Sequence, residues 1–175
     1  SETDRVVEES ERTNKEIERH SEEMVRDSER TNKEIEEHSR EVIERLREIL
    51  ERIERLVRKG VPKDELKKLV EDLRRRAKEA LDRDRELLRR DKEKIDEVLK
   101  RDTELAERDK REIDKKVRDE EKMRRLKEET DRILDKSRRE LKRLKDETDK
   151  LLEDSERLLR EVEKTLRRIL EEARK

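Results

Sequence analysis

An 18-residue repeat near the start of the chain is the feature that most limits how it can fold. From Ser10 onward the sequence reads SERTNKEIERHSEEMVRD and then SERTNKEIEEHSREVIER. Eighteen residues are five turns of an α-helix, so a side chain and its copy point the same way from a straight helix. Five inward positions recur in this way: Thr13, Asn14, Ile17, His20 and Ser21 return as Thr31, Asn32, Ile35, His38 and Ser39. The repeat therefore predicts a long helix with polar residues where a helix normally carries its apolar stripe.

The charge pattern favours helices over disorder. Asp, Glu, Lys and Arg make up 62% of the 175 residues, a fraction often found in disordered chains. Here, however, 54 basic and 55 acidic residues interleave to a net charge of −1, and most of them are strong helix formers that can pair at i,i+4. This composition is typical of a helical bundle or coiled coil.

Several classes of function are disfavoured by what the sequence lacks. There is no Cys, and apolar runs never exceed two residues, so neither a disulfide framework nor a membrane span is expected. The balanced charge and the absence of aromatic residues argue against nucleic-acid binding. We expect no cofactor, no metal and no small-molecule ligand, and the sequence indicates no cellular compartment.

The apolar pattern predicts three helices in a single domain over residues 1–175. The first helix runs over about 3–59, with its inward residues covering an arc of roughly 140°. Gly60-Val61-Pro62 forms the connection at 60–62, because Gly suits a helix C-terminus and Pro the first turn of the next helix. The second helix covers about 63–117, and within it Asp84 and Asp91 recur as Asp102 and Asp109, again 18 residues apart.

A second connection is predicted from a change of phase rather than from Gly or Pro. The apolar stripe beyond residue 122 is rotated by roughly 90° from that of the second helix, which one straight helix cannot accommodate. We therefore expect a turn at about 118–122 and a third helix over about 123–174; a continuous helix over 63–175 is the alternative. The third helix repeats too: Thr130 and Ser137 return as Thr148 and Ser155.

Three helices of similar length joined by short turns predict a long, straight, antiparallel three-helix bundle (up-down-up), all-α and coiled-coil-like. Residues at the same height should have numbers that sum to about 123 for the first two helices and about 239 for the last two. This register groups the polar positions in four layers: Thr13 and Asn14 with Asp109 and Thr130; His20 and Ser21 with Asp102 and Ser137; Thr31 and Asn32 with Asp91 and Thr148; His38 and Ser39 with Asp84 and Ser155.

Each layer combines donors with acceptors. A buried polar group without a partner costs about 1–3 kcal/mol, so such residues enter a core where they can satisfy one another. Their value lies mainly in specificity, because a shifted register would leave them unpaired.

The near-perfect repeats, the Glu/Lys/Arg surface, the lone Gly-Val-Pro connection and the Thr/Asn/His/Ser/Asp layers resemble de novo designed helical bundles with modular buried hydrogen-bond networks. The resemblance covers the whole chain. It implies a straight, stable bundle used as a rigid scaffold, as one half of a designed heterodimer or as a switchable assembly. We expect a soluble synthetic protein, made in a bacterial cytoplasm, that has no natural biochemical activity and serves as a structural scaffold. Natural spectrin-like coiled coils are a more distant match, because they usually contain core aromatics.

Other functions are open to the same residues. His20, Asp102 and Ser137 are the residue types of a nucleophilic triad, but a filled core that lacks oxyanion donors favours a structural role, and no enzyme is expected. One His per layer falls short of a zinc site. A pH response through the two histidines is a further hypothesis. Burial disfavours the protonated imidazole and a nearby Asp favours it, so the larger of these two effects decides whether acid destabilises or stabilises the fold. The wide arc of the first helix also allows the chain to be one component of a homo- or hetero-oligomer, with itself or another designed helical chain as partner.

Overall fold

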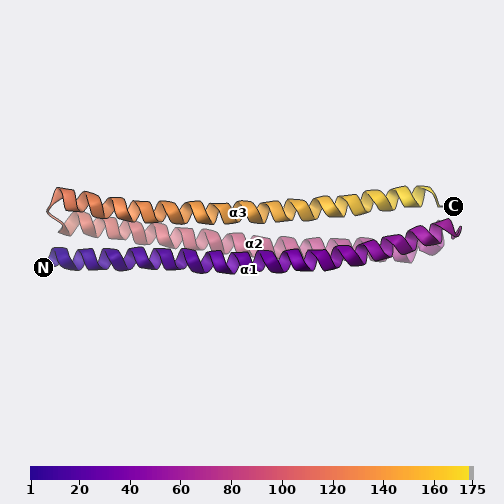
Figure 1. The fold of residues 1–175 in the computed structure, drawn as a ribbon, viewed down its shortest axis with the longest axis horizontal. Coiled ribbons are helices and arrows are strands. Elements are labelled where there is room, and N and C mark those ends of the chain that lie inside the picture. The colour runs from indigo at the N-terminus through magenta and orange to yellow at the C-terminus, as the bar shows by residue number, and fades with distance from the viewer. Residues whose placement is uncertain (174–175) are drawn as a thin grey trace. The chain divides into compact units, whose positions relative to one another are not determined.

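The computed structural model describes residues 1–173, which form three α-helices (Figure 1). These are α1 (Glu2–Arg58), α2 (Lys63–Lys116) and α3 (Glu120–Glu171). The fold class predicted from the sequence, an all-α three-helix bundle, is confirmed. The second connection lies at 117–119, so the alternative of one helix over 63–175 is wrong. The predicted end of the third helix, at about 174, lies outside the described residues.

The connection between α1 and α2 is closed by a Schellman motif. Gly60 has a φ of +84°, in the left-handed region that favours glycine. The Gly60 N–H donates to the Val57 carbonyl (2.9 Å) and the Val61 N–H donates to the Leu56 carbonyl (3.1 Å). Leu56 and Val61 both pack against the neighbouring apolar core, which is the contact expected of this motif.

The connection between α2 and α3 uses an acidic N-cap. The Asp119 carboxylate accepts a hydrogen bond from the Lys122 backbone N–H at 3.1 Å, which satisfies one of the free donors in the first turn of α3. Glu120 and Glu121 follow in that first turn, where negative charge is favourable at the positive end of the helix dipole. This short turn, whose first residue, Val117, is buried in the core, needs neither Gly nor Pro.

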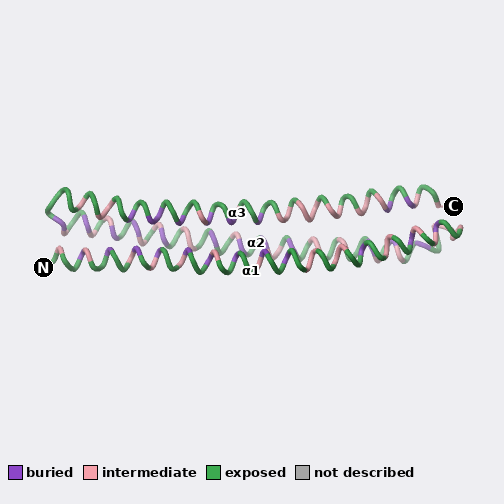
Figure 2. Tube along the Cα trace, viewed as in Figure 1, coloured by how far each residue is buried: buried purple, intermediate pink, exposed green. Residues whose placement is uncertain are grey.

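Contacts between Cα atoms divide the chain into two compact units, each built from a stretch of all three helices. The first unit comprises 1–30 and 90–147, and the second comprises 31–89 and 148–175. In both, buried residues recur at helical spacing along each helix (Figure 2).

In the first unit α2 runs antiparallel to α1 and α3. Ser10 bonds Asp109 and Ser28 bonds Asp91, so residue numbers rise along α1 while those of the α2 partners fall. Ion pairs between α2 and α3 follow the same rule: Asp96–Lys145 (2.6 Å), Lys110–Asp131 (2.9 Å) and Asp114–Lys127 (2.8 Å). These solvent-exposed pairs contribute about 0–1 kcal/mol each, so they orient the helices more than they stabilise them. Three small apolar clusters, one around Ile17, one around Ile95 and one around Ile113, fill the core between polar positions.

The second unit has one continuous apolar core. Eight buried apolar side chains form it, with a further set packed around them that stays partly exposed. The buried members are Leu46, Ile53, Val57, Leu66, Val70, Leu73, Leu166 and Ile169. Helix α2 is again antiparallel to its neighbours, as the contacts Ser39–Asp84 and Arg74–Glu163 require. None of the three helices, as far as residue 173, combines the length and the apolar character that a membrane span needs.

Candidate functional site: the buried polar layers

Polar side chains lie inside the core at regular intervals along all three helices. The buried ones are Ser10, Asn14, Ser21, Ser28, Asn32, Asp84, Asp91, Asp102, Asp109, Thr130, Ser137 and Thr148. Four of these are carboxyl groups, which are seldom buried without partners. Their hydrogen bonds therefore determine what this part of the molecule can do.

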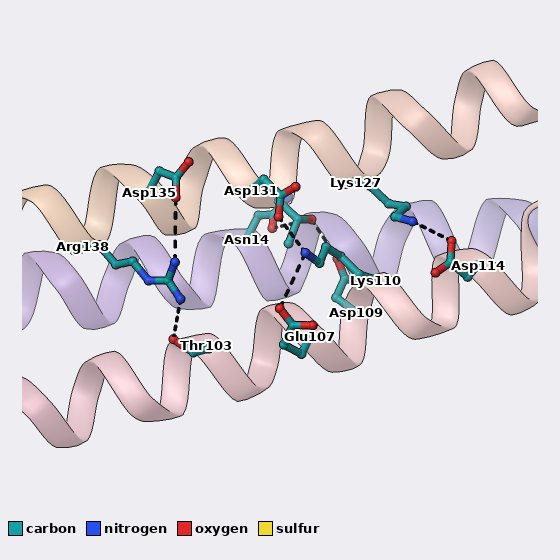
Figure 3. A network of polar contacts seen from close by, with 11 residues as sticks. Asn14, Thr103, Glu107, Asp109, Lys110, Asp114, Lys127, Asp131, Asp135 and Arg138 are labelled. Atoms are coloured by element: carbon teal, nitrogen blue, oxygen red, sulfur yellow. Dashed lines mark hydrogen bonds and ion pairs between the residues drawn. The ribbon is translucent and has the colours of Figure 1, made fainter.

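Asp109 accepts hydrogen bonds from both neighbouring helices of the first unit. Figure 3 shows Asp109 on α2 with Asn14 of α1 nearby. Its Oδ2 accepts from the Ser10 hydroxyl at 2.8 Å and lies 2.9 Å from the Thr130 hydroxyl. The Thr130 hydroxyl also lies 3.2 Å from Asn14 Oδ1. Since a hydroxyl carries one proton, Thr130 donates to one of these two acceptors at a time. Four residues from three helices are thereby connected around one carboxylate.

At the solvent edge of this layer, Lys110 lies between two acids (Figure 3). Its Nζ is 2.9 Å from Asp131 Oδ1 and 3.6 Å from Glu107 Oε1. The hydrogen bond to Asp131 raises the pKa of Lys110 above its ordinary value, so the lysine stays charged. Asp131, which the repeat places beside this layer, is therefore bound at the surface.

The contact between Ser10 and Asp109 is repeated one period along. Ser28 donates to Asp91 Oδ2 at 2.7 Å, and both residues lie 18 positions from their counterparts. Ser10 and Ser28 do not belong to the four predicted layers. The signal that identifies them is the 18-residue repeat itself, because each precedes the Thr-Asn pair of its block by three residues.

His20 and Asp102 form the most buried histidine–carboxylate contact. His20 Nδ1 lies 2.8 Å from Asp102 Oδ1, the Asp102 side chain is 0% exposed and that of His20 is 12% exposed. Because an ionised carboxylate only accepts, the proton of this hydrogen bond sits on Nδ1. Ser21 and Ser137 are joined to each other through their hydroxyl groups in the same region. The predicted members of this layer thus occur as two pairs.

Burial raises the pKa of the Asp102 carboxyl above its ordinary value, and the interactions with His20 and, to a smaller extent, with Ser137 oppose part of that rise. The second carboxylate oxygen, Oδ2, accepts no hydrogen bond from the described residues. Asp102 is thus a buried acid that is only half satisfied.

The second copy of this layer, in the second unit, has different contacts. Ser39 donates to Asp84 Oδ2 at 3.2 Å, while His38 Nε2 lies 3.3 Å from Arg83 Nη1. A guanidinium group only donates, so Nε2 of His38 is the acceptor. Burial raises the pKa of Asp84, and the Ser39 hydrogen bond lowers it by less. Ser155 is half-buried near the same core and lines a small cavity with Ser39 and Asp84.

The remaining predicted positions are placed less fully. Asp91 belongs to the first unit, whereas Thr31, Asn32 and Thr148 belong to the second, so their grouping in one layer stays a prediction. Asn32 Oδ1 and Thr148 Oγ1 are buried with no hydrogen-bond partner among the described residues. Thr13 and Thr31 are half-buried.

The chemistry available in these layers is hydrogen bonding inside a packed core. Within residues 1–173, no group of three or more His, Cys, Asp or Glu side chains is placed to hold a metal ion. His20 bonds Asp102, and Ser137 bonds Ser21 instead of His20. The three triad residue types are therefore not aligned as nucleophile, base and orienting acid.

Together, these features define the class of protein: an antiparallel three-helix bundle with charged surfaces and polar residues inserted at fixed intervals in its core. Among known proteins, no family model and no curated protein matches the sequence. A solved chain described as "Computationally designed three helix bundle" is 16% identical, with a TM-score of 0.39, over 96% of this chain and 91% of that chain. Because this identity and this TM-score are low, the fold is assigned from the helices and contacts of the chain itself.

Proposed function

We propose that this chain is a designed structural scaffold whose buried polar residues specify which helices pair and in which register. The observation that carries the proposal is the layer around Asp109, where the hydroxyls of Ser10 and Thr130 come from the two other helices and meet at one carboxylate. Asn14 joins the layer through Thr130. A slip of one helix by a single turn would separate these groups and leave a buried carboxylate unsatisfied. Such an error costs on the order of several kcal/mol, whereas the satisfied layer adds little net stability.

The 18-residue period supports the same proposal. The pairs Ser10–Asp109 and Ser28–Asp91 have nearly equal lengths, 2.8 Å and 2.7 Å, at equivalent places in the repeat. A modular element inserted more than once into a regular backbone produces this pattern. No other chemistry requires it.

The test replaces the whole Asp109 layer by apolar residues in one variant, Ser10→Ala, Asn14→Leu, Asp109→Leu and Thr130→Val. We expect a thermal stability equal to or above that of the parent, because a fully apolar layer avoids desolvating a carboxylate. We also expect more than one species by light scattering and broadened amide NMR spectra, since register is no longer enforced. Retention of one monomeric species with sharp spectra would contradict the proposal.

The matched control is Thr130→Val alone. This change keeps the side-chain volume but removes the hydroxyl that donates a hydrogen bond to Asp109. It should therefore destabilise the chain by about 1–3 kcal/mol. Thr165→Val, at a half-buried threonine of the same helix outside the polar layers, should cost less. The opposite effects of single and complete replacement distinguish a specificity element from a simple stabilising contact.

A second candidate, one component of a helical oligomer, is favoured by the apolar residues of the second unit. Eleven apolar side chains packed on its core are only partly buried, against at most three around any cluster of the first unit. A partner helix from another copy or another chain would cover some of them. Light scattering over a range of concentrations decides this: a constant mass near 21.6 kDa favours the self-contained scaffold, and a mass that rises with concentration favours the oligomer.

A further inference from the structure

A groove between α1 and α2 opens on the surface of the second unit, beside His38. Its volume is about 380 Å³, within the range of roughly 300–1,000 Å³ that small-molecule sites occupy in proteins. Neither the scaffold role nor the polar layers require it.

The groove exists because two side chains are smaller here than at the equivalent positions of the first unit. Val42 and Ala80 stand 18 residues from Met24 and Val98. In the first unit, Met24 is buried and packs with Ile95, and Val98 contacts the same cluster. In the second unit, the shorter Val and Ala leave that volume empty next to the repeated histidine. The chain thus contains a filled copy and an open copy of one structural element.

The open copy has an apolar floor. Val42, Leu46 and Ala80 line it, and Leu46 is fully buried beneath. These three side chains offer a surface without hydrogen-bonding groups. Burial of a ligand's apolar body against them gains about 25 cal/mol per Å² removed from water.

The rim of the groove is positively charged. Arg45, Arg76 and Arg83 line it together with a single acid, Glu79, which itself lies 4.0 Å from Arg75. Arg76 is paired with Asp72 at 3.2 Å, but Arg83 contacts the uncharged acceptor Nε2 of His38. Asp84, the nearest buried carboxyl, is bonded to Ser39 on the core side. The rim therefore complements an anion.

We propose that this groove binds a small aromatic monocarboxylate. The aromatic ring lies on Val42 and Ala80, where guanidinium groups from the rim can stack on its face, and the carboxylate is held by Arg83 and Arg45. A flat ring fits a seam between two helices. With Arg76 paired to Asp72, Arg45 and Arg83 exceed Glu79 by one positive charge, which a single carboxylate matches.

The experiment titrates 2-naphthoate into the intact chain and follows circular dichroism in the near ultraviolet. Because the chain has no Phe, Trp or Tyr, any signal in this region arises from the probe in a chiral site. We expect saturable binding of one molecule per chain. 2-Naphthalenemethanol, which keeps the ring and lacks the charge, should bind at least about tenfold more weakly.

The chain supplies its own control substitutions. Val42→Met with Ala80→Val introduces the residues of the filled copy and should weaken binding by about tenfold or more. Arg83→Gln can still donate to His38 but loses the charge, and should also weaken binding. The converse variant opens the first unit with Met24→Val and Val98→Ala. It also carries Asp27→Arg, because the first unit has an acid where the second unit has Arg45. This variant should add a second binding site. Far-ultraviolet circular dichroism checks that each variant is folded.

Unsaturable binding, or an affinity that is the same in the parent and in the filled variant, would overturn the proposal. An unchanged affinity in Arg83→Gln would overturn the role of the cationic rim. If the filled variant does not fold, the stoichiometry of the Met24→Val, Val98→Ala, Asp27→Arg variant decides the question: one site per chain contradicts the proposal and two sites support it.

Discussion

At the scale of single residues, the two histidine–aspartate repeats show what a residue pattern can and cannot specify. His20 bonds Asp102, whereas His38 contacts Arg83. In that second copy Asp84 accepts its hydrogen bond from Ser39. The period places both copies at equivalent heights of their helices. The choice of partner depends on side-chain torsions and on the size of neighbouring residues, which the 18-residue period does not encode. The layers expected from sequence omit Ser10 and Ser28, although the 18-residue repeat marks both residues and the structure brings both to a carboxylate.

The buried acids also determine how stability should change with pH. The pKa values of Asp84 and Asp102 are raised in the folded chain, mainly by burial. Between the ordinary pKa of Asp and the raised value, the folded state binds more protons than the unfolded state. The contribution of these two groups to the free energy of unfolding therefore increases as pH falls through that window, and is lost as pH rises through the folded-state pKa.

We predict that the double variant Asp84→Asn, Asp102→Asn removes this dependence. The parent should gain stability relative to the variant between pH 7 and about pH 4, measured by urea denaturation at several pH values. Exposed ion-paired acids whose pKa is lowered, such as Glu112 and Glu129, act in the opposite sense in both proteins and cancel in the difference. Asp27→Asn with Asp135→Asn removes two exposed carboxyls as a control. A parent-to-variant difference that is independent of pH would mean that the buried carboxyls titrate normally.

At the scale of helices, the two connections differ in how far the sequence reveals them. Gly60 and Pro62 mark the first connection directly, and the structure has α1 end at Arg58 and α2 begin at Lys63. The second connection carries no such residue, and only the change of phase of the apolar stripe indicates it. Its chemical signal is Asp119, an N-cap followed by two acids, but in a chain so rich in Asp and Glu that short pattern is not distinctive.

We predict that Gly60→Ala destabilises the chain by about 1–2 kcal/mol, the cost of holding an L-residue with a side chain in the left-handed region. An added Cβ would meet no atom within 4 Å, so the loss is conformational and not steric. Gly60→Asn should cost less, because Asn tolerates this conformation better than Ala. Chemical denaturation of the three proteins measures both differences. Equal stability of the Ala and Asn variants would show that the helix end relaxes out of the Schellman geometry.

At the scale of the whole molecule, composition, phase and repeat length were sufficient to predict the three helices and their antiparallel order. They predicted less about how the apolar side chains are distributed between the two units. The first unit divides its apolar side chains among small clusters separated by polar layers, and the second unit concentrates them in one core. The inward positions of the first helix between Val42 and Val57 are all apolar in the sequence, which does indicate that difference. The groove beside His38 was not predicted, because it arises from two modest losses of volume, at Val42 and Ala80, that leave the apolar pattern unchanged.

This uneven distribution of apolar contacts predicts uneven local stability. Opening the second unit exposes its continuous core, whereas a local opening in the first unit exposes one small cluster and rehydrates polar groups that water can satisfy. We therefore expect backbone amides around Leu46–Val57, Leu66–Leu73 and Leu166–Ile169 to exchange with deuterium more slowly than those around Ser10–Ser28 and Asp91–Asp109. Hydrogen exchange followed by mass spectrometry measures this, with the exposed first turn of α1 as the fast-exchanging reference.

Leu46→Ala should bring the second unit's amides to the faster rate, since removing a fully buried Leu costs about 2–5 kcal/mol. Uniform protection along all three helices would instead mean that the polar layers contribute as much cooperativity as the apolar core.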